Sequence, residues 1–284
     1  MSAPGRTVAG FFAAARPRID RLDARLLLQH VSGLSHAAII GEPEHPLGAE
    51  TWRALEILVE RRAAGEPLAY LVGSADFRGR RFAVSPAVLI PRPETEGLVD
   101  LALEKMQDCS SPRCVDLGTG SGVIAVSLKL ECPAARMMAV DVSQEALVVA
   151  AANAQRLAAD VDFRAGSWYA PLAGERFHLI VSNPPYVAEG DPHLDLNGLP
   201  YEPRSALTDG GDGLGCLRVI VGGAMAHLEP GGWLLFEHGY DQGQFSRNLL
   251  TAAGFEAPFT APDLAGIDRI SGGRKPLNMK ESGA

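Results

Sequence analysis

Residues 115–122, VDLGTGSG, decide the fold of this 284-residue chain. They end an apolar run that begins at Cys114, and apolar residues at helical spacing resume at Val123. Glycines at alternating positions let the backbone turn sharply and approach a ligand closely. A strand, a glycine loop and a helix in this order are typical of an open α/β sheet, whose ligands bind beyond the carboxyl ends of the strands.

The alternation of strands and helices continues along the chain. Strands are predicted at Cys114–Leu117, Met137–Asp141, Val161–Arg164, His178–Ser182 and Trp233–His238, and helices at Val123–Leu130 and Gln144–Leu157. A last antiparallel pair is expected near residues 257–260 and 269–271. This order favours a parallel, doubly wound, Rossmann-like α/β sheet. We expect this domain to span residues 93–284 and to open with a helix at Pro93.

Residues 1–75 have the pattern of a small helical domain. Stripes at helical spacing are formed by Leu22, Leu26, Leu27, Leu28 and Val31, and by Trp52, Leu55, Leu58 and Val59. Residues 76–92 change to short apolar runs around the sequence RGR, which predicts a β-hairpin that links two domains. The cluster of Arg78, Arg80 and Arg81 either lies in a solvated turn or steers a protein partner through charge.

Composition and charge limit the class of protein. The chain is 46% hydrophobic and 21% charged, and it has no apolar run long enough to cross a membrane. Its start lacks the apolar core of a signal peptide, and its four cysteines match no zinc pattern, so free thiols in the cytoplasm and no metal site are expected. Acidic and basic residues balance in residues 1–75, so the rest of the chain carries the whole net charge of −8. An acidic catalytic region argues against nucleic acid as the main substrate.

The glycine loop and the acid after the next strand predict a cofactor site. The spacing is G-x-G-x-G rather than the G-x-G-x-x-G that seats a pyrophosphate, and no nucleotide-triphosphate loop is present. Asp141 ends the next strand, where a carboxylate can accept hydrogen bonds from both hydroxyls of a ribose. The expected cofactor is therefore one that contains adenosine. Trp168, after the third strand, either packs on the adenine or belongs to the core.

The sequence Asn183-Pro184-Pro185-Tyr186 follows the fourth predicted strand and forms a second candidate site. The prolines have a fixed φ and no N–H, so the loop is stiff and rich in acceptors. Such a loop can accept both N–H groups of a planar amide or amine and hold its weakly nucleophilic nitrogen against a methyl donor. The side-chain oxygen of Asn183 is expected to accept one N–H, with its own NH2 toward the cofactor. The ring of Tyr186 offers a surface for a flat substrate and a developing cation.

Several motifs make the chain resemble one family. The glycine loop and Asn-Pro-Pro-Tyr occur with GEPLAY at 65–70, LIPRPETE at 89–96, DPHL at 191–194 and EHG at 237–239. The combination resembles the bacterial HemK/PrmC family, protein-(glutamine-N5) methyltransferases of peptide chain release factors. The resemblance extends over nearly the whole chain. Tyr240 and Arg204 depart from the expected Trp and apolar residue.

The resemblance implies an activity, a cofactor and a partner. A methyl group would pass from S-adenosyl-L-methionine to the side-chain amide nitrogen, N5, of the glutamine in the Gly-Gly-Gln motif of class-I release factors. The helical domain would help to dock that protein. The residues implied to contact the cofactor are Gly118, Thr119, Gly120, Ser121, Gly122, Asp141, Trp168 and Asn183. The residues implied to hold the glutamine are Asn183, Pro184, Pro185 and Tyr186, of which Asn183, Pro184 and Tyr186 are the catalytic candidates.

Two other functions remain as alternatives. An adenine-N6 methyltransferase of DNA or RNA would share the Asn-Pro-Pro-Tyr loop, because adenine also presents a planar NH2. The acidic catalytic region and the lack of a second, basic domain to grip and flip a base count against it. A non-enzymatic cofactor-binding protein is the second alternative, and the intact reactive loop counts against it.

Overall fold

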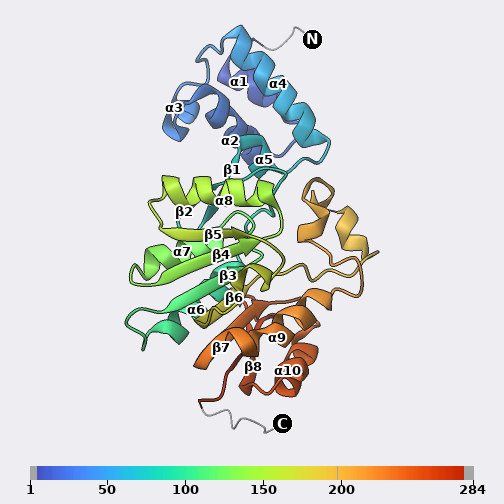
Figure 1. Ribbon diagram of the computed structural model, residues 1–284. Helices are drawn as coiled ribbons and strands as arrows, with labels where there is room; N and C mark the ends of the chain where they lie inside the picture. The colour runs from blue at the N-terminus through green and yellow to red at the C-terminus, as the bar shows by residue number, and fades with distance from the viewer. Residues whose placement is uncertain (1–4, 197, 278–284) are drawn as a thin grey trace. The chain divides into compact units, whose positions relative to one another are not determined.

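The computed structural model describes residues 5–196 and 198–277 and shows two compact units (Figure 1). Unit 1 contains the described part of Met1–Ser74 together with that of Asp195–Tyr201. Unit 2 contains Ala75–Leu194 and the described part of Glu202–Ala284. Each unit has its own hydrophobic core.

Unit 1 is helical. Its helices are α1 (Val8–Ala15), α2 (Arg21–Ser32), α3 (His36–Gly41), α4 (Ala49–Ala63) and α5 (Leu68–Val72), with the short 3-10 helix η3 (Leu199–Tyr201). The ends of α2 show how the sequence sets these boundaries. Asp20 accepts a hydrogen bond from the backbone N–H of Leu22 at the start, and Gly33 ends the helix with a left-handed φ of 71°.

The core of unit 1 forms where α2 meets α4. Ala24, Leu27 and Leu28 of α2 and Leu55 of α4 are buried. Leu22 is 50% exposed, so its predicted place in the buried stripe is wrong. The periodicity explains the difference, because positions three and four residues after Ala24 share its face, whereas Leu22 lies on another face of the first turn.

Unit 2 is built on one seven-stranded sheet with the order β5-β4-β3-β6-β7-β9-β8. The strands are β3 (Arg113–Leu117), β4 (Arg136–Asp141), β5 (Val161–Ala165), β6 (Phe177–Ser182), β7 (Leu228–Glu237), β8 (Glu256–Pro262) and β9 (Asp268–Arg274). The neighbouring strands β5, β4, β3, β6 and β7 run parallel to one another. Strand β9 pairs antiparallel with both β7 and β8. The predicted doubly wound sheet with an antiparallel edge is confirmed.

Helices cover both faces of the sheet, as Figure 1 shows. They are α6 (Thr95–Met106), α7 (Val123–Glu131), α8 (Gln144–Arg156), α9 (Gly215–His227) and α10 (Gly243–Ala252). Alternate strand residues enter two separate cores, since Cys114 belongs to the core with α6 and α7, and Val115 to the core with α9 and α10. Helix α6 begins at Thr95 rather than at the predicted Pro93.

The register of the parallel strands brings the candidate loops to one edge. Leu117 pairs with Val140 on one side and with Ser182 on the other, and Ser182 pairs with Phe236. The next residue of each strand or loop therefore lies at the same carboxyl edge. These next residues are Gly118, Asp141, Asn183 and Glu237. The edge is where an open α/β sheet binds its ligands.

The predicted hairpin is present and shorter than expected. Its strands are β1 (Ser74–Phe77) and β2 (Arg80–Ala83), which form a separate two-stranded sheet. Residues 84–92 add no strand. Asn153 anchors the hairpin to α8. Its side-chain oxygen accepts the N–H of Ala83, and its side-chain nitrogen donates to the carbonyl of Ala83.

The arginines of the hairpin do not form a free basic cluster. Arg78 contacts Asp100 and Arg80 contacts Glu131, each at 2.7 Å. The side chain of Arg81 is 74% exposed. Arg81 also lies 3.8 Å from Asp76, and the steering of a partner by these charges stays a prediction.

The connection from β6 to α9 consists of short turns. It includes the 3-10 helices η2 (Pro192–Asp195) and η4 (Arg204–Ala206), and a further one, η1 (Ala170–Leu172), precedes β6. The N–H of Val187 donates to the carbonyl of Leu207, so the two ends of the connection lie side by side. Glu202, whose side chain is 1% exposed, binds Arg92 at 2.5 Å and the N–H of Ile90 at 2.9 Å. These contacts fix residues 202–208 beside the segment that precedes α6.

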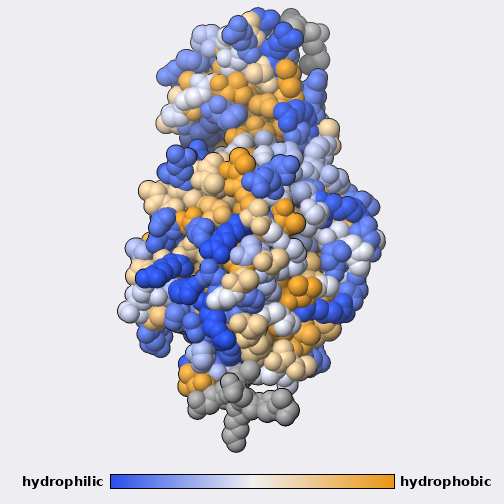
Figure 2. All heavy atoms as spheres, in the orientation of Figure 1, coloured by the Kyte–Doolittle hydropathy of each residue, from blue (hydrophilic) through white to orange (hydrophobic). Residues whose placement is uncertain are grey.

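The surface in Figure 2 mixes hydrophilic and hydrophobic residues on the face shown. Within residues 5–196 and 198–277, no helix is long and apolar enough to cross a membrane. All four cysteines are free thiols. In the same described ranges, no three His, Cys, Asp or Glu side chains gather as a metal site.

Candidate active site

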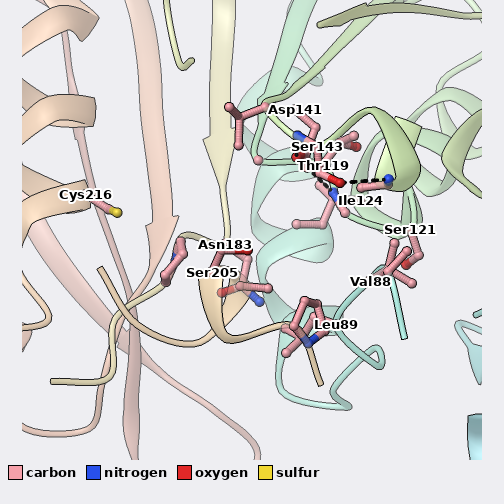
Figure 3. A pocket seen from close by; sticks show the side chains of 18 of the residues that line it. Val88, Leu89, Thr119, Ser121, Ile124, Asp141, Ser143, Asn183, Ser205 and Cys216 are labelled. Atoms are coloured by element: carbon pink, nitrogen blue, oxygen red, sulfur yellow. Dashed lines mark hydrogen bonds between the residues drawn. The ribbon is translucent and has the colours of Figure 1, made fainter. Parts of the chain in front are cut away.

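A cavity of about 490 Å³ opens at the carboxyl edge of the sheet in unit 2 (Figure 3). This volume is in the range of small-molecule sites. Figure 3 shows Thr119, Asp141 and Ser143 grouped at one end of the cavity, with Asn183 and Ser205 close together further along. The glycine loop, the acid after β4 and the loop after β6 therefore share one cavity.

The glycine loop takes a backbone conformation that other residues rarely adopt. Gly118 and Gly120 have φ values of 74° and 56°. The N–H groups of Gly118 and Thr119 both donate to the carbonyl of Val140, at 2.8 and 3.0 Å. A Cβ on Gly120 would meet no atom within 4 Å. The loop therefore leaves open space where a ligand can approach the backbone.

Gly122 has a different task from the other loop glycines. It is the N-terminal cap of α7, with a φ of 83°. A Cβ at this position would lie 3.1 Å from the Cβ of Ala150 in α8. The residue allows α7 and α8 to approach each other, and it does not line the cavity.

Asp141 is anchored by the backbone around it. One carboxylate oxygen accepts the N–H of Gly120 at 2.8 Å, and the other accepts the N–H of Ser143 at 2.9 Å. Each oxygen keeps a second lone pair. The carboxylate is thus held rigid at the cavity wall and can still accept hydrogen bonds from two vicinal hydroxyls, the arrangement that a ribose requires.

Trp168 both packs against the core and lines the cavity. Its φ of 48° is unusual for a bulky residue and costs about 1–3 kcal/mol. Its ring lies 3.5 Å from the position that a Cβ of Gly118 would take. A Cβ at Gly118 would make only an ordinary van der Waals contact with the ring, so the indole supplies a flat apolar wall directly beside the loop.

A buried acid supports the glycine loop from below. Asp116 is fully buried, and its Oδ2 accepts a hydrogen bond from Thr119 Oγ1 at 2.7 Å. Burial raises the pKa of Asp116 to about 7, although hydrogen bonds from Thr119 and Ala125 favour the charged form. The loop that lines the cavity is thus tied to a carboxyl group that changes charge near neutral pH.

Asn183 is held by a chain of hydrogen bonds. Its Nδ2 donates to Thr95 Oγ1 at 3.1 Å, and Thr95 Oγ1 donates to Glu237 Oε2 at 2.7 Å. The other oxygen of Glu237 accepts the hydroxyl of Tyr186 at 3.1 Å. One N–H of Asn183 thus goes to Thr95, and the expectation that the NH2 also faces the cofactor stays a prediction.

Glu237 is 1% exposed, and its surroundings explain how a carboxyl group is accommodated there. Burial raises its pKa, while the hydrogen bonds from Thr95 and Tyr186 and the charge of Arg269 oppose that rise. Burial and the neighbouring Glu237 also raise the pKa of Tyr186 above its usual range. The phenol of Tyr186 therefore stays neutral and acts as a hydrogen-bond donor.

The structure brings most of the predicted site residues together. Those that line the cavity are Gly118, Thr119, Gly120, Ser121, Asp141, Trp168, Asn183 and Pro185. Gly122, Pro184 and Tyr186 do not line it. Pro184 is buried, and Tyr186 points its hydroxyl at Glu237. The roles of these residues in binding and catalysis remain predictions.

Sequence reasoning missed two residues that hold the reactive loop, Thr95 and Glu237. Both lie in motifs that served only as marks of resemblance, PETE and EHG. It also missed the pair of Arg92 and Glu202, which fixes one wall of the cavity. Nothing in local periodicity connects such positions, because each pair joins distant segments of the chain.

Two family models match the chain. Residues 6–73 match the PrmC N-terminal domain, and residues 98–214 match the methyltransferase small domain. The two matches fall in the helical unit and in the unit with the cavity.

Curated relatives match over almost the whole length. The release factor glutamine methyltransferase of Bordetella pertussis is 51% identical over 263 residues, which cover 91% of this chain and 96% of the relative. That of Burkholderia pseudomallei is 49% identical over 280 residues, covering 96% and 98%. The expected HemK/PrmC resemblance is confirmed.

Solved structures support the fold. A methyltransferase from Pyrococcus furiosus superposes with a TM-score of 0.53 at 17% identity, covering 79% of this chain and 98% of that one. The T. thermophilus 16S rRNA N2 G1207 methyltransferase, solved with AdoMet and guanosine, gives 0.51 at 18% identity, covering 71% and 49%. At these identities the likeness concerns the fold alone.

Proposed function

This chain belongs to the release factor glutamine methyltransferase family, and on that premise we propose that it methylates a release factor. The methyl group comes from S-adenosylmethionine, and the acceptor is the side-chain amide nitrogen, N5, of a glutamine. The observation that carries the proposal is that Asn183 and Asp141 line one cavity in a chain 51% identical to a release factor glutamine methyltransferase.

The residues around the cavity fit S-adenosylmethionine. Asp141 offers two anchored acceptors for the ribose, and the ring of Trp168 offers an apolar face for the adenine. The open space above Gly120 admits a ligand against the backbone. When bound, the cofactor supplies an electrophilic methyl group on a positively charged sulfur.

The loop after β6 is suited to hold the substrate amide. Among the described residues, none donates a hydrogen bond to Asn183 Oδ1, so this oxygen remains available to accept an N–H of the glutamine side chain. The nitrogen of an amide is a weak nucleophile because its lone pair is delocalised. A fixed acceptor orients the nitrogen and stabilises the positive charge that develops on it.

Glu237, the buried acid behind Asn183, is not a free base. Both oxygens of Glu237 already accept hydroxyl hydrogens, from Thr95 and Tyr186. The proton of the amide therefore leaves after the methyl transfer, when the nitrogen has become strongly acidic. We assign the orientation of the amide during methyl transfer to the loop Asn183–Tyr186, in which Asn183 and Pro185 line the cavity while Pro184 and Tyr186 keep the loop stiff and anchored.

The partner is proposed to be a class-I release factor, methylated in its Gly-Gly-Gln motif, with no direct role for nucleic acid. The net charge of −8 supports a protein rather than a nucleic acid as substrate. Residues 1–75 are proposed to dock it, and Leu22, Ile40 and Ile57 are exposed apolar side chains of that unit. The enzyme would then work in the cytoplasm, where its substrate acts.

The test is to incubate the protein with labelled S-adenosylmethionine and either a release factor, DNA or RNA. Mass spectrometry of the Gly-Gly-Gln peptide should then show one added methyl group on the glutamine. Label in the nucleic acid would instead favour the adenine-N6 alternative. Binding of the cofactor with no transfer to any acceptor would contradict an enzymatic function.

A further inference from the structure

Two residues far apart in the sequence meet behind the reactive loop. Thr95 begins α6 and Glu237 ends β7, and their side-chain oxygens lie 2.7 Å apart. Both are almost fully buried, at 2% and 1% exposure. They belong to the PETE and EHG motifs, which the cofactor and substrate contacts proposed above leave without a task.

The chemistry of a hydroxyl group fixes the direction of this chain. A threonine hydroxyl has one hydrogen, and here that hydrogen goes to the carboxylate of Glu237. Toward Asn183, Thr95 Oγ1 can then only accept. Asn183 must therefore donate one N–H to Thr95, and among the described residues its Oδ1 has no donor and can accept a hydrogen bond from a substrate.

The same carboxylate also holds the other end of the motif. Glu237 Oε1 accepts the hydroxyl of Tyr186, so one buried side chain binds both Tyr186 and, through Thr95, Asn183. Gln242 adds a third contact, because its Nε2 donates to the carbonyl of Tyr186 at 2.9 Å. The prolines stiffen the backbone of the loop, and the hydrogen bonds to Thr95 and Glu237 hold the side chains of Asn183 and Tyr186.

We propose that Thr95 and Glu237 are positioning residues that fix the amide of Asn183 with its oxygen toward the substrate, and so select an amide over a carboxylate. This rests on the proposed function. An oxygen at that position accepts an N–H from glutamine, whereas the carboxylate of a glutamate would face it with like partial charge. If the amide turned over, its NH2 would favour glutamate instead.

Four variants separate positioning from simple folding. Thr95→Val keeps the shape and removes the hydroxyl, while Thr95→Ser keeps the hydroxyl and serves as the conservative rescue. Glu237→Gln keeps the size of the side chain but replaces one carboxylate oxygen, an acceptor, with an NH2 group, a donor. Lys275→Met is the matched control, because Lys275 is a buried donor to the carbonyls of Met225 and Leu228 near the other end of β7.

The first measurement is single-turnover methylation of a release factor at saturating cofactor, with thermal unfolding of each variant. Thr95→Val and Glu237→Gln should each lower the rate about 10²-fold, the effect of losing a preorganised hydrogen-bonding group. Thr95→Ser and Lys275→Met should keep most of the wild-type rate. The double variant Thr95→Val/Glu237→Gln should lose less than the product of the single losses, since both act through Asn183.

The second measurement compares how strongly two peptides inhibit methylation of the release factor. One contains Gly-Gly-Gln, and the other has glutamate in place of that glutamine. Wild type should prefer glutamine, and the preference should fall toward equality in Thr95→Val, a change that a general loss of stability would not produce. If Thr95→Val does not fold, Glu237→Gln is subjected to the same comparison.

If wild type methylates the release factor but the folded variants show unchanged rates and an unchanged peptide preference, the positioning roles of Thr95 and Glu237 are overturned. The proposed function would then still stand. Equal losses in Thr95→Ser or Lys275→Met would also overturn these positioning roles. Absence of methylation by wild type would overturn the proposed function, and this inference with it.

Discussion

Replacing Asp116 with asparagine should change how stability depends on pH. Asp116 is fully buried under the glycine loop, and its pKa is raised from 3.8 to about 7. The folded protein therefore binds a proton more tightly than the unfolded chain does. Between these two values the folded state carries the extra proton, so the free energy of unfolding falls as pH rises.

The size of the effect follows from the shift. A change from 3.8 to about 7 is roughly 3.2 units, and each unit corresponds to about 1.36 kcal/mol, so wild type should lose up to about 4 kcal/mol. This contribution is fully present below pH 3.8 and is lost as pH rises through about 7. The amide introduced by Asp116→Asn is neutral throughout and could still accept the hydroxyl of Thr119, so the variant should lack this loss.

The assay is urea unfolding of wild type and Asp116→Asn, followed by tryptophan fluorescence from about pH 4 to pH 8. The stability of the variant relative to wild type should rise across this range. Asp108→Asn is the control, because it removes a carboxylate that is exposed in the structure. Parallel stability curves for wild type and Asp116→Asn would refute the reasoning, since burial of the carboxyl would then cost nothing.

Three further substitutions test the site. Asp141→Ala should weaken cofactor binding by about 1.5–3 kcal/mol, measured by calorimetry, with a smaller effect on turnover at saturating cofactor, and an unchanged dissociation constant would remove Asp141 from the site. Asn183→Ala should slow single-turnover methylation about 10²–10³-fold, and Asn183→Asp should fall between Ala and wild type, whereas wild-type rates in the Ala variant would mean that Asn183 only shapes the loop. Gly118→Ala should cost about 1–3 kcal/mol of stability in urea unfolding, because Gly118 has a φ of 74°, and a variant as stable as wild type would show that the loop can change conformation.

Local patterns in the sequence were sufficient for the sheet and the two loops. The predicted strand Met137–Asp141 lies within β4, and the predicted helix Val123–Leu130 is one residue shorter than α7. Such elements are set by periodicity, which acts over a few residues. The left-handed turns at Gly118 and Gly120 follow from the absence of a side chain, which is also a local property.

Local patterns failed where burial or long-range contact decided the outcome. Residues 84–92 have strand-like apolar spacing, but they add no strand to the hairpin. Leu22 has the hydrophobicity of a core residue, but its place on the helix leaves it half exposed. Burial depends on what packs against a segment, and the segment itself does not carry that information.

The sequence by itself determined that a glycine loop, an acid and a stiff Asn-Pro-Pro-Tyr loop would follow successive strands of a parallel sheet. Only the tertiary structure decided which atoms of those loops are free. Thr95 and Glu237 are 142 positions apart and meet because α6 packs beside the end of β7. Through Thr95 this contact binds one N–H of Asn183, while the oxygen of that amide has no donor among the described residues. A hydrogen bond is short and directional, so it exists only once the fold has brought its two partners together.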